Sequence, residues 1–327
     1  MDEKSVDVTA IGTLAVDYFA LLKTIPAADE KIMAKKYEIH PGGVAGNVMT
    51  QVARLGARAG WFGKIGDDAA GGILLDDFRN EGIDTSHTEV VSNRHSMFTW
   101  IQVNSRGERA ITMFPGVLVE LTAEDVFVKH AEYIRTSKVM HTEACLLPLK
   151  PVVQAMEIAK AASVKIVYDL DVSPSYFVDE AKLATKKEMQ RALELADVLI
   201  PCKSAARELI GSDDIAGNVS KLLDFGPEIV AVTLGRRGCV VCDRSGSHRI
   251  PAYHADVVDT TGAGDAFHGG FIYGVLRGYD LEKAGRFANA CGAICCTQVG
   301  ARSMGKLDEV KHLMDHGGIA AKCNNVP

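Results

Sequence analysis

The sequence predicts an α/β fold with a doubly wound, mostly parallel sheet and helices on both of its faces. Short apolar runs alternate with amphipathic stretches along most of the chain, and this alternation is typical of parallel strands joined by crossover helices. The length of 327 residues is enough for one large domain of this kind. Two segments depart from the alternation, because their short apolar runs have no helix between them. They predict a small additional sheet.

The composition excludes several classes of protein. The chain has 36 Lys and Arg against 42 Asp and Glu, a net charge of −6, whereas a nucleic-acid-binding protein needs a basic face. Apolar residues make up 47% and charged residues 24% of the chain, which are ordinary values for a packed domain. No apolar run reaches the roughly 18 residues that a membrane span requires. We therefore expect neither a nucleic acid nor a membrane as partner.

Two features indicate a cytoplasmic protein. The chain begins with Met-Asp-Glu-Lys, whereas a secretory signal has a basic start and a longer apolar core. Most of the eight cysteines lie within apolar stretches, where a free cysteine behaves as a small hydrophobic residue.

The elements of the main domain follow from these runs in chain order. We expect its strands at Val6–Ile11, Ala59–Ile65, Val139–Thr142, Lys165–Asp169, Val198–Pro201, Ile229–Thr233 and Cys239–Asp243. We expect helices at Gly43–Leu55, Asp68–Glu81, Pro151–Ala162, Glu180–Ala196 and Lys203–Ile210. Sheets of this type bind ligands beyond the carboxyl ends of their strands.

The additional sheet consists of four short strands. They are expected at Tyr18–Leu22, Ile32–Ile39, Met97–Val103 and Arg109–Met113. A small sheet outside the main one can close over a site as a lid, and an antiparallel extension of the main sheet is the alternative. The chain is then a single domain over 1–317, with lid segments at about 13–41 and 93–117 and a flexible tail at 318–327.

The lid also predicts an assembly. Its outward face carries Phe19, Leu21, Met33 or Tyr37, depending on the register. Exposed apolar side chains on a small sheet favour a partner, so we expect a homodimer through the lid. A monomer that covers these residues with its own substrate is the alternative.

The most informative stretch is a glycine-rich turn before an apolar helix that extends to about Leu276. The turn reads Gly262-Ala263-Gly264, and Asp265 follows in the first turn of the helix. The glycines let backbone N–H groups approach a ligand, and a helix N-terminus favours an anion. Asp265 is either a helix-capping residue or a general base that takes a proton from a hydroxyl group. His268, three residues later, lies on about the same face.

The motif around this turn is longer, and a second motif lies near the start of the chain. The first reads Asp259-Thr-Thr-Gly-Ala-Gly-Asp265, followed by Ala-Phe-His-Gly-Gly. The second reads Pro41-Gly-Gly-Val-Ala-Gly-Asn47, followed by Ala53-Arg-Leu-Gly56 and Gly63-Lys-Ile-Gly-Asp-Asp68. Together they resemble the two signatures of the ribokinase-like (PfkB) carbohydrate kinases, and the resemblance extends from about Val8 to Ser303. It implies a ribokinase-like fold.

The resemblance implies roles for individual residues. Asp265 matches the catalytic base, and the amides of Gly262, Ala263 and Gly264 match the anion hole over the transferred phosphoryl group. The positions that match sugar-binding residues are Asp17, Gly42, Gly43, Asn47 and Glu143. The segment Thr233-Leu-Gly235 with Gly238 resembles a nucleotide loop, and Asn289 matches a position at the adenine pocket. Lys203 is a further candidate for the nucleotide phosphates, although a solvated lysine at a helix start is the alternative.

The resemblance also implies cofactors, namely ATP, Mg²⁺ and a monovalent cation such as K⁺. Asp169 and Asp171 match positions near Mg²⁺ and the phosphates. Asp259, Thr261 and Ser303 resemble a monovalent cation site. The Asn-x-x-Glu motif of the family is absent, because the corresponding stretch reads Cys202-Lys-Ser-Ala205 and the next acidic residue is Glu208. Ala15 also replaces an Asn of ribokinase itself, which disfavours ribose as substrate.

These observations predict a kinase that transfers the γ-phosphoryl group of ATP to a hydroxyl of a small sugar, sugar acid or polyol. The chain has neither a GxxxxGK[ST] P-loop nor protein-kinase motifs, so the helix N-terminus and one base would perform the transfer. A nucleoside kinase of the same fold is the alternative enzyme. A non-catalytic sugar-binding relative is the alternative from another class, and the presence of Asp265 argues against it.

Overall fold

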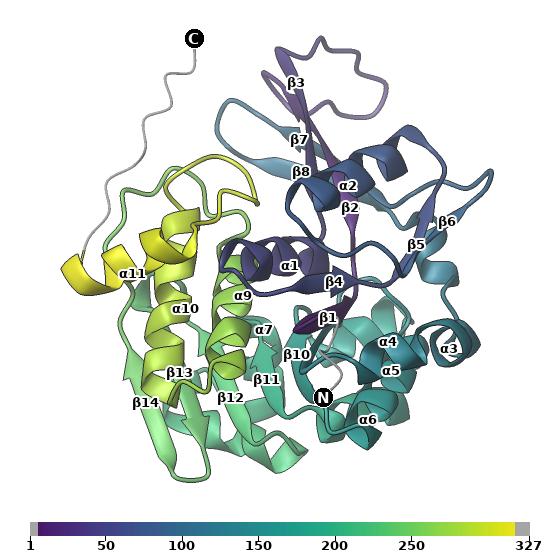
Figure 1. The fold of residues 1–327 in the computed structure, drawn as a ribbon. Helices are drawn as coiled ribbons and strands as arrows, with labels where there is room; N and C mark the ends of the chain where they lie inside the picture. The colour runs from purple at the N-terminus through teal and green to yellow at the C-terminus, as the bar shows by residue number, and fades with distance from the viewer. Residues whose placement is uncertain (1–5, 318–327) are drawn as a thin grey trace.

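The computed structural model describes residues 6–317, so the tail expected at 318–327 lies outside the described residues. A large sheet with helix layers on both faces forms the body, and a small sheet projects from it (Figure 1). The fold class predicted from the sequence is confirmed. Among residues 6–317, no helix has both the length and the apolar character needed to cross a membrane.

The main sheet has the strand order β14-β13-β12-β11-β10-β9-β1-β4. The strands β4, β1, β9, β10, β11 and β12 are parallel, and β13 and β14 add an antiparallel edge. Their bounds are β1 Val8–Ile11, β4 Ala59–Trp61, β9 Val139–Glu143, β10 Lys165–Leu170, β11 Val198–Pro201, β12 Ile229–Thr233, β13 Cys239–Asp243 and β14 Gly246–Ile250. The central strands are almost continuously apolar because helices cover them on both faces.

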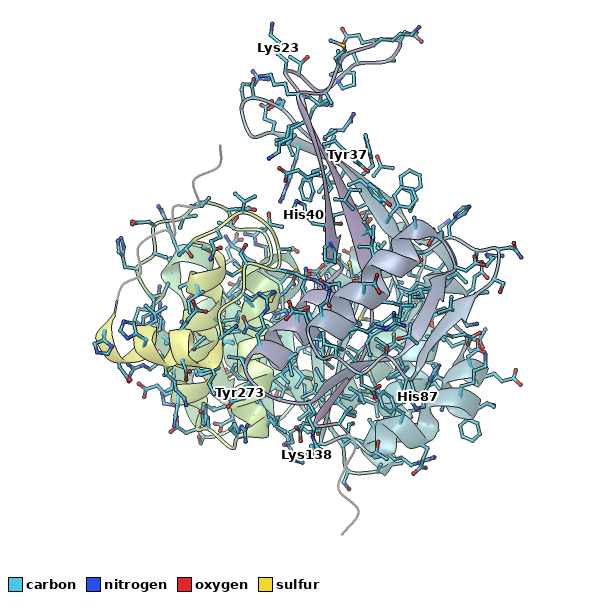
Figure 2. All side chains as sticks on the ribbon, turned by 45° about the horizontal axis from the view of Figure 1, so that its top comes forward. Lys23, Tyr37, His40, His87, Lys138 and Tyr273 are labelled. Atoms are coloured by element: carbon cyan, nitrogen blue, oxygen red, sulfur yellow. The ribbon has the colours of Figure 1, made fainter. Side chains whose placement is uncertain are left out.

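The small sheet has the order β3-β2-β7-β8, and a separate pair is formed by β5 and β6. The bounds are β2 Ala15–Leu21, β3 Lys36–Gly42, β5 Gly63–Gly66, β6 Thr88–Val91, β7 Phe98–Val103 and β8 Arg109–Phe114. Figure 2 shows this sheet standing out from the body, with Lys23 near its tip and His40 near its root. We call these four strands the lid sheet.

Two helix layers enclose the main sheet (Figure 1). One contains α1 Val44–Arg54, α9 Ala263–Leu276, α10 Leu281–Cys295 and α11 Leu307–His316. The other contains α4 Ala131–Arg135, α5 Leu149–Ala161, α6 Lys186–Leu195 and α7 Lys203–Ile210. The remaining helices are α2 Ala69–Asn80 beside the lid sheet, α3 Ala123–Asp125 and α8 Ile215–Asn218. Helix α9 is buried along most of its length because α1 and α10 both pack on it.

Local side-chain chemistry sets several helix boundaries. Asp68 caps α2 by accepting a hydrogen bond from the Gly71 amide at 2.9 Å. Thr185 and Glu188 form a capping box, so α6 begins at Lys186 and not at Glu180 as the sequence predicts.

Helices α4, α10 and α11 were not among the expected elements, and several strands differ as well. The run expected at 59–65 is two strands, because β4 pairs with β1 whereas β5 leaves the main sheet to pair with β6. The strand expected from Ile32 begins at Lys36. The edge strand β14 was not expected, since its sequence Gly-Ser-His-Arg-Ile is polar and four of its five residues are exposed.

Candidate active site

The predicted site residues converge where the parallel strands end. Glu143 is the last residue of β9, Asp169 lies near the end of β10, and Asp171 follows that strand. The glycine-rich turn before α9 and the start of α1 approach the same edge. The lid sheet begins there as well, because β2 follows β1 after Gly12-Thr-Leu. The carboxyl edge of the sheet is where ligands bind in folds of this type.

The turn before α9 has the geometry of an anion site. Gly262 adopts a left-handed conformation with φ of 78°, and a Cβ there would collide with the backbone of Ala301. The Ala263 amide donates to the Thr260 carbonyl at 3.2 Å. This amide is therefore hydrogen-bonded within the turn, whereas the resemblance implies that it faces the transferred phosphoryl group. Helix geometry leaves the N–H groups of Gly264 and Asp265 pointing out of the helix end.

Gly264 differs from Gly262 in a way the sequence does not reveal. Its conformation is helical, and a Cβ at Gly264 would meet no atom within 4 Å. Gly264 is also exposed. Backbone strain therefore does not explain a glycine at this position, whereas open space over the helix end suits a ligand.

Asp265 is held by one side chain from α1. The Asn47 amide donates from Nδ2 to Asp265 Oδ2 at 2.7 Å. Burial raises the pKa of Asp265 to about 7, the Asn47 hydrogen bond opposes the rise, and the negative charges of Asp171 and Asp169 add to it. A carboxyl group with a pKa near neutrality is suited to act as a general base.

Arg302 is a residue of the site that the sequence reasoning missed. It lies in the loop after α10, and its Nε donates to Asn47 Oδ1 at 3.0 Å. Its side chain also pairs with Asp77 of α2 and donates to the Gly42 carbonyl at 3.2 Å. No local motif marks it, since it is a single arginine in Gly-Ala-Arg-Ser. Its role could be recognised only together with its partners Asn47 and Asp77, which lie more than 200 positions earlier in the chain.

Glu143 fixes the point where the chain leaves the main sheet for the lid sheet. Its Oε1 accepts from the Thr13 amide at 2.6 Å and its Oε2 from the Thr13 hydroxyl at 3.4 Å. The Thr13 hydroxyl in turn accepts from the Val44 amide at 2.9 Å, at the start of α1 and next to Gly43. Glu143 is fully buried, and this burial raises its pKa well above the usual value. Its carboxyl group therefore holds the segment between β1 and β2, at the root of the lid sheet.

Asp17 lies at the root of the lid sheet, opposite the end of β3. Its Oδ1 accepts from the Thr99 hydroxyl of β7 at 2.5 Å. Burial raises the pKa of Asp17, while the Thr99 hydrogen bond and the charge of Arg302 oppose the rise. Gly42, the last residue of β3, is packed against the Asp17 carboxyl group. The arrangement brings Asp17 and Gly42 together, as the resemblance implies.

Asp169 and Asp171 differ in environment. The Asp169 carboxylate is buried and forms an ion pair with His268 Nδ1 at 2.7 Å. Burial opposes a charged His268, but the Asp169 carboxylate outweighs it and raises the pKa of His268. Asp171 is exposed to solvent, although burial by the surrounding protein and the charge of Asp169 raise its pKa to about 6. Asp171 is therefore the accessible member of the pair.

The residues predicted to bind the nucleotide lie at the same carboxyl edge of the sheet, near the ends of β11 and β12. Thr233 ends β12, and the loop from Gly235 to Gly238 closes with a hydrogen bond from the Leu234 amide to the Gly238 carbonyl at 2.7 Å. Asn289 of α10 donates to the carbonyls of Ile250 and Pro251 at 3.2 and 3.1 Å, so it fixes the loop after β14. Lys203 is exposed at the start of α7.

The residues expected at a monovalent cation site form one loop cluster. Asp259 accepts from the Thr261 amide at 3.0 Å, from its hydroxyl at 2.8 Å and from the Gly300 amide at 3.0 Å. Ser303 donates to the Val299 carbonyl at 2.7 Å. Within residues 6–317, no group of three or more His, Cys, Asp or Glu side chains is arranged to hold a metal ion.

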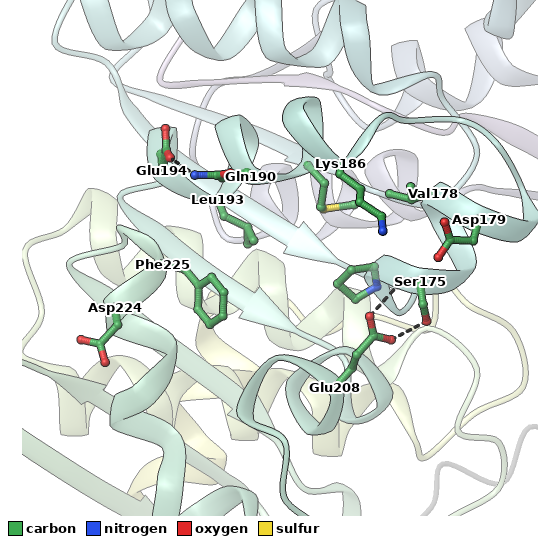
Figure 3. Close-up of a pocket in the computed structure, with 12 residues that line it drawn as sticks. Ser175, Val178, Asp179, Lys186, Gln190, Leu193, Glu194, Glu208, Asp224 and Phe225 are labelled. Atoms are coloured by element: carbon green, nitrogen blue, oxygen red, sulfur yellow. Dashed lines mark hydrogen bonds between the residues drawn. The ribbon is translucent and has the colours of Figure 1, made fainter.

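Glu208 does not replace the missing acidic residue of the Asn-x-x-Glu motif. Its carboxylate accepts from the Ser175 amide at 2.9 Å and from the Ser175 hydroxyl at 2.6 Å (Figure 3). These contacts lie in a cavity of about 540 Å³ between α6, α7 and the loop after β10. The cavity contains none of the residues predicted for the site. We therefore place the functional site at the carboxyl edge of the main sheet and not in this cavity.

Comparison with known proteins agrees with the fold. The family model of the pfkB family carbohydrate kinases matches residues 6–307. A ribokinase of Haemophilus influenzae is 29% identical over 304 residues, which cover 90% of this chain and 94% of the relative. Fructokinase-1 of Oryza sativa subsp. japonica is 29% identical over 310 residues, covering 90% and 93%. Arabidopsis thaliana ribokinase, solved with ribose and ATP, has a TM-score of 0.84 at 23% identity and covers 94% of this chain and 98% of its own.

The fold, the glycine-rich turn and the matching relatives define a phosphotransferase that acts on an alcohol group. The chain belongs to the PfkB family of carbohydrate kinases.

Proposed function

We propose that this kinase transfers the γ-phosphoryl group of ATP to a hydroxyl of a small sugar, sugar acid or polyol, with Asp265 as the general base. The observation that carries the proposal is the placement of Asp265 in the first turn of α9, held by Asn47 at 2.7 Å. One carboxylate oxygen is thereby engaged, and the other remains for the acceptor hydroxyl. Because burial raises the pKa of Asp265 to about 7, the carboxylate can accept a proton at neutral pH.

The helix end supplies the second part of the mechanism. Phosphoryl transfer depends mainly on positioning and on stabilising negative charge. The outward N–H groups of Gly264 and Asp265, together with the helix dipole, favour the charge on the transferred group. The Gly262 conformation keeps this end of the helix open, and the exposed backbone at Gly264 gives the phosphoryl group access.

The residues present also fit the cofactors that the family implies. Mg²⁺ prefers oxygen ligands and usually keeps several water molecules, and the Asp171 carboxylate is the accessible acidic group beside the helix end. Asp169 would act indirectly, because His268 engages it. Mg²⁺ would neutralise charge on the ATP phosphates.

The loops around Thr233, Gly238 and Asn289 would hold the nucleotide, with the exposed Lys203 as a cation near the phosphates. The Asp259, Thr261 and Ser303 loop would take the monovalent cation.

The acceptor would bind between the lid sheet and the body. Asp17 presents a carboxyl group at the root of the lid sheet, a suitable acceptor for sugar hydroxyls. Gly42 and Gly43 allow close packing where the lid sheet joins α1, because a Cβ on either glycine would collide with the Asp17 carboxyl group or with the backbone of residues 13–15. Glu143 holds Thr13 below them. Two of the matching relatives differ in the sugar that their names state, a ribokinase and a fructokinase, each 29% identical to this chain. The acceptor is therefore proposed as a class.

The proposal is tested by measuring ADP formation with ATP and Mg²⁺ across pentoses, hexoses, sugar acids, polyols and nucleosides. We expect turnover with at least one sugar, sugar acid or polyol and at most weak turnover with nucleosides. Turnover confined to nucleosides would favour the nucleoside kinase of the same fold. Sugar binding by calorimetry without ADP formation would favour a non-catalytic sugar-binding protein and overturn the proposal.

A further inference from the structure

Arg302 is a buried cation with defined partners on three separate segments. Its Nε donates to Asn47 Oδ1 at 3.0 Å and its Nη2 to the Gly42 carbonyl at 3.2 Å. Its Nη1 pairs with the Asp77 carboxylate, and its guanidinium lies 5.7 Å from the centre of the Phe78 ring. Only 8% of the side chain is exposed. Burying a charged side chain this deeply is costly unless its hydrogen bonds are satisfied. The partners of Arg302 satisfy them, and Asn47 and Gly42 among these partners belong to the candidate site.

The surrounding chain is shaped to admit this guanidinium. A Cβ on Gly46 would lie 2.8 Å from Arg302 Nη2, so a larger residue at Gly46 would push the guanidinium away from α1. The loop that carries Arg302 is itself held by Arg54, which donates to the carbonyls of Arg302 and Met304 at 2.7 and 3.0 Å. The Gly46 position therefore leaves room for the Arg302 guanidinium, and Arg54 holds the backbone of Arg302.

The contact with Asn47 has a chemical consequence. An asparagine amide has an acceptor end and a donor end, and it can rotate to exchange them. Arg302 donates only, so it requires Oδ1 of Asn47 on its side and directs Nδ2 toward Asp265 Oδ2, 2.7 Å away. The opposite orientation would place an amide oxygen against a carboxylate and would leave the buried guanidinium without this acceptor.

We propose that Arg302 is a positioning residue for phosphoryl transfer, which orients the Asn47 amide and thereby fixes the carboxylate of Asp265. Its hydrogen bond to the Gly42 carbonyl, at the end of β3, connects the same group to the root of the lid sheet. Arg302 therefore contacts both the residue that holds the base and the root of the lid sheet, and we assign its effect on kcat to the contact with Asn47. This inference rests on the proposed function, because it assigns a role relative to the base.

The first test replaces the buried ion pair as a unit. Arg302→Met alone would leave Asp77 as an unpaired buried charge, so we combine it with Asp77→Leu, which keeps the interior apolar. We expect kcat to fall about 10²-fold, the typical effect of a small displacement of a reacting group, with the KM for ATP nearly unchanged. Lys160→Met/Asp197→Asn is the control, because it removes an ion pair at the opposite edge of the sheet as a unit, while Asn can still accept the hydrogen bond from the Ile166 amide. It should retain the wild-type kcat.

The second test separates positioning from a general structural effect. In an Asn47→Ala background, the Arg302→Met/Asp77→Leu replacement should cause no further loss of kcat, because its effect passes through Asn47. Multiplicative losses of kcat in the combined variant would overturn the proposal. If the double replacement does not fold, Arg302→Lys keeps the charge beside Asp77 but lacks the planar set of donors. We expect at least a tenfold loss of kcat there, and a folded Arg302→Lys with wild-type kcat would equally overturn it.

The same assay distinguishes this inference from the proposed function. A wild-type protein without kinase activity on any acceptor refutes the proposed function and this inference with it. A wild type that is active, loses activity as Asp265→Asn and keeps it when Arg302 is replaced supports the base and refutes the role of Arg302.

Discussion

Asp265 combines two properties at the scale of a single residue. It lies at a helix end that favours negative charge on a ligand, and its own negative charge is disfavoured by burial and by Asp169 and Asp171. Burial and the two neighbouring carboxylates together raise the pKa of Asp265. At a pKa near neutrality, a base can both accept and release a proton.

This pKa predicts the pH dependence of the enzyme. The base acts in its deprotonated form, and burial raises the pKa of Asp265 to about 7. The value of kcat/KM should therefore be half-maximal near pH 7, level off about one pH unit above it and fall about tenfold per pH unit well below it. A pH–rate profile between pH 5 and 9 measures this. A flat profile between pH 5 and 8 would contradict the assignment of the raised pKa to the essential base.

The two glycines of the turn should respond differently to alanine. Gly262→Ala introduces a Cβ in a left-handed conformation and against Ala301, so we expect a loss of about 1–3 kcal/mol in the free energy of unfolding. Gly264→Ala lies in a helical conformation with open space, so stability should be retained or slightly increased. Its methyl group would nevertheless obstruct the approach of phosphate, and kcat should fall. Denaturant unfolding and steady-state kinetics on both variants test this, and full activity in Gly264→Ala would argue against the anion site.

The lid sheet is the element with the most exposed apolar surface. The register of β2, β3, β7 and β8 places Phe19, Ile111 and Met113 on the face that Asp17 shares. The opposite face carries Tyr37 and Trp100, together with Ile39 and Phe114. The residues that the sequence suggested for the outward face therefore do not share one face. Phe19 and Leu21 lie on the face of Asp17, Tyr37 lies on the opposite face, and Met33 precedes β3.

This apolar surface leads us to propose a homodimer through the lid sheet. Light scattering should give about twice the chain mass of 35.1 kDa at micromolar concentration. A charge on the interface face should produce a monomer, so Trp100→Glu and Ile111→Glu, on opposite faces, identify which face is covered. The variant that dissociates should also bind the acceptor more weakly, because the lid sheet loses its support. A monomeric mass for the wild type would refute the dimer and leave the kinase assignment unaffected.

Across the whole molecule, the sequence was most informative where the signal is local. The alternation of apolar runs and amphipathic stretches predicts the α/β fold, because strand and helix periodicities are properties of neighbouring residues. Asp265 could be proposed as the base for the same reason, since it lies within one short motif with Gly262 and Gly264. The capping box at Thr185 is also local, and it shows that α6 could have been placed correctly.

The features that the sequence did not reveal depend on distant pairs. Arg302 and Asn47 are 255 positions apart, and Glu143 meets Thr13 across 130 positions. The strand pairing that decides the face of Phe19 is likewise a property of the assembled lid sheet. The ion pair between Asp169 and His268 changes the expectation for Asp169, from a group near Mg²⁺ to one engaged inside the protein.

The most direct test of the central claim is the kcat of Asp265→Asn on the best acceptor, measured together with ATP affinity and thermal stability. The substitution keeps the shape of the side chain and removes its ability to accept a proton. We expect a loss of kcat of about 10²- to 10⁴-fold, with ATP affinity and melting temperature close to those of the wild type. A folded Asp265→Asn variant with a kcat near the wild-type value would contradict the role of Asp265 as the base.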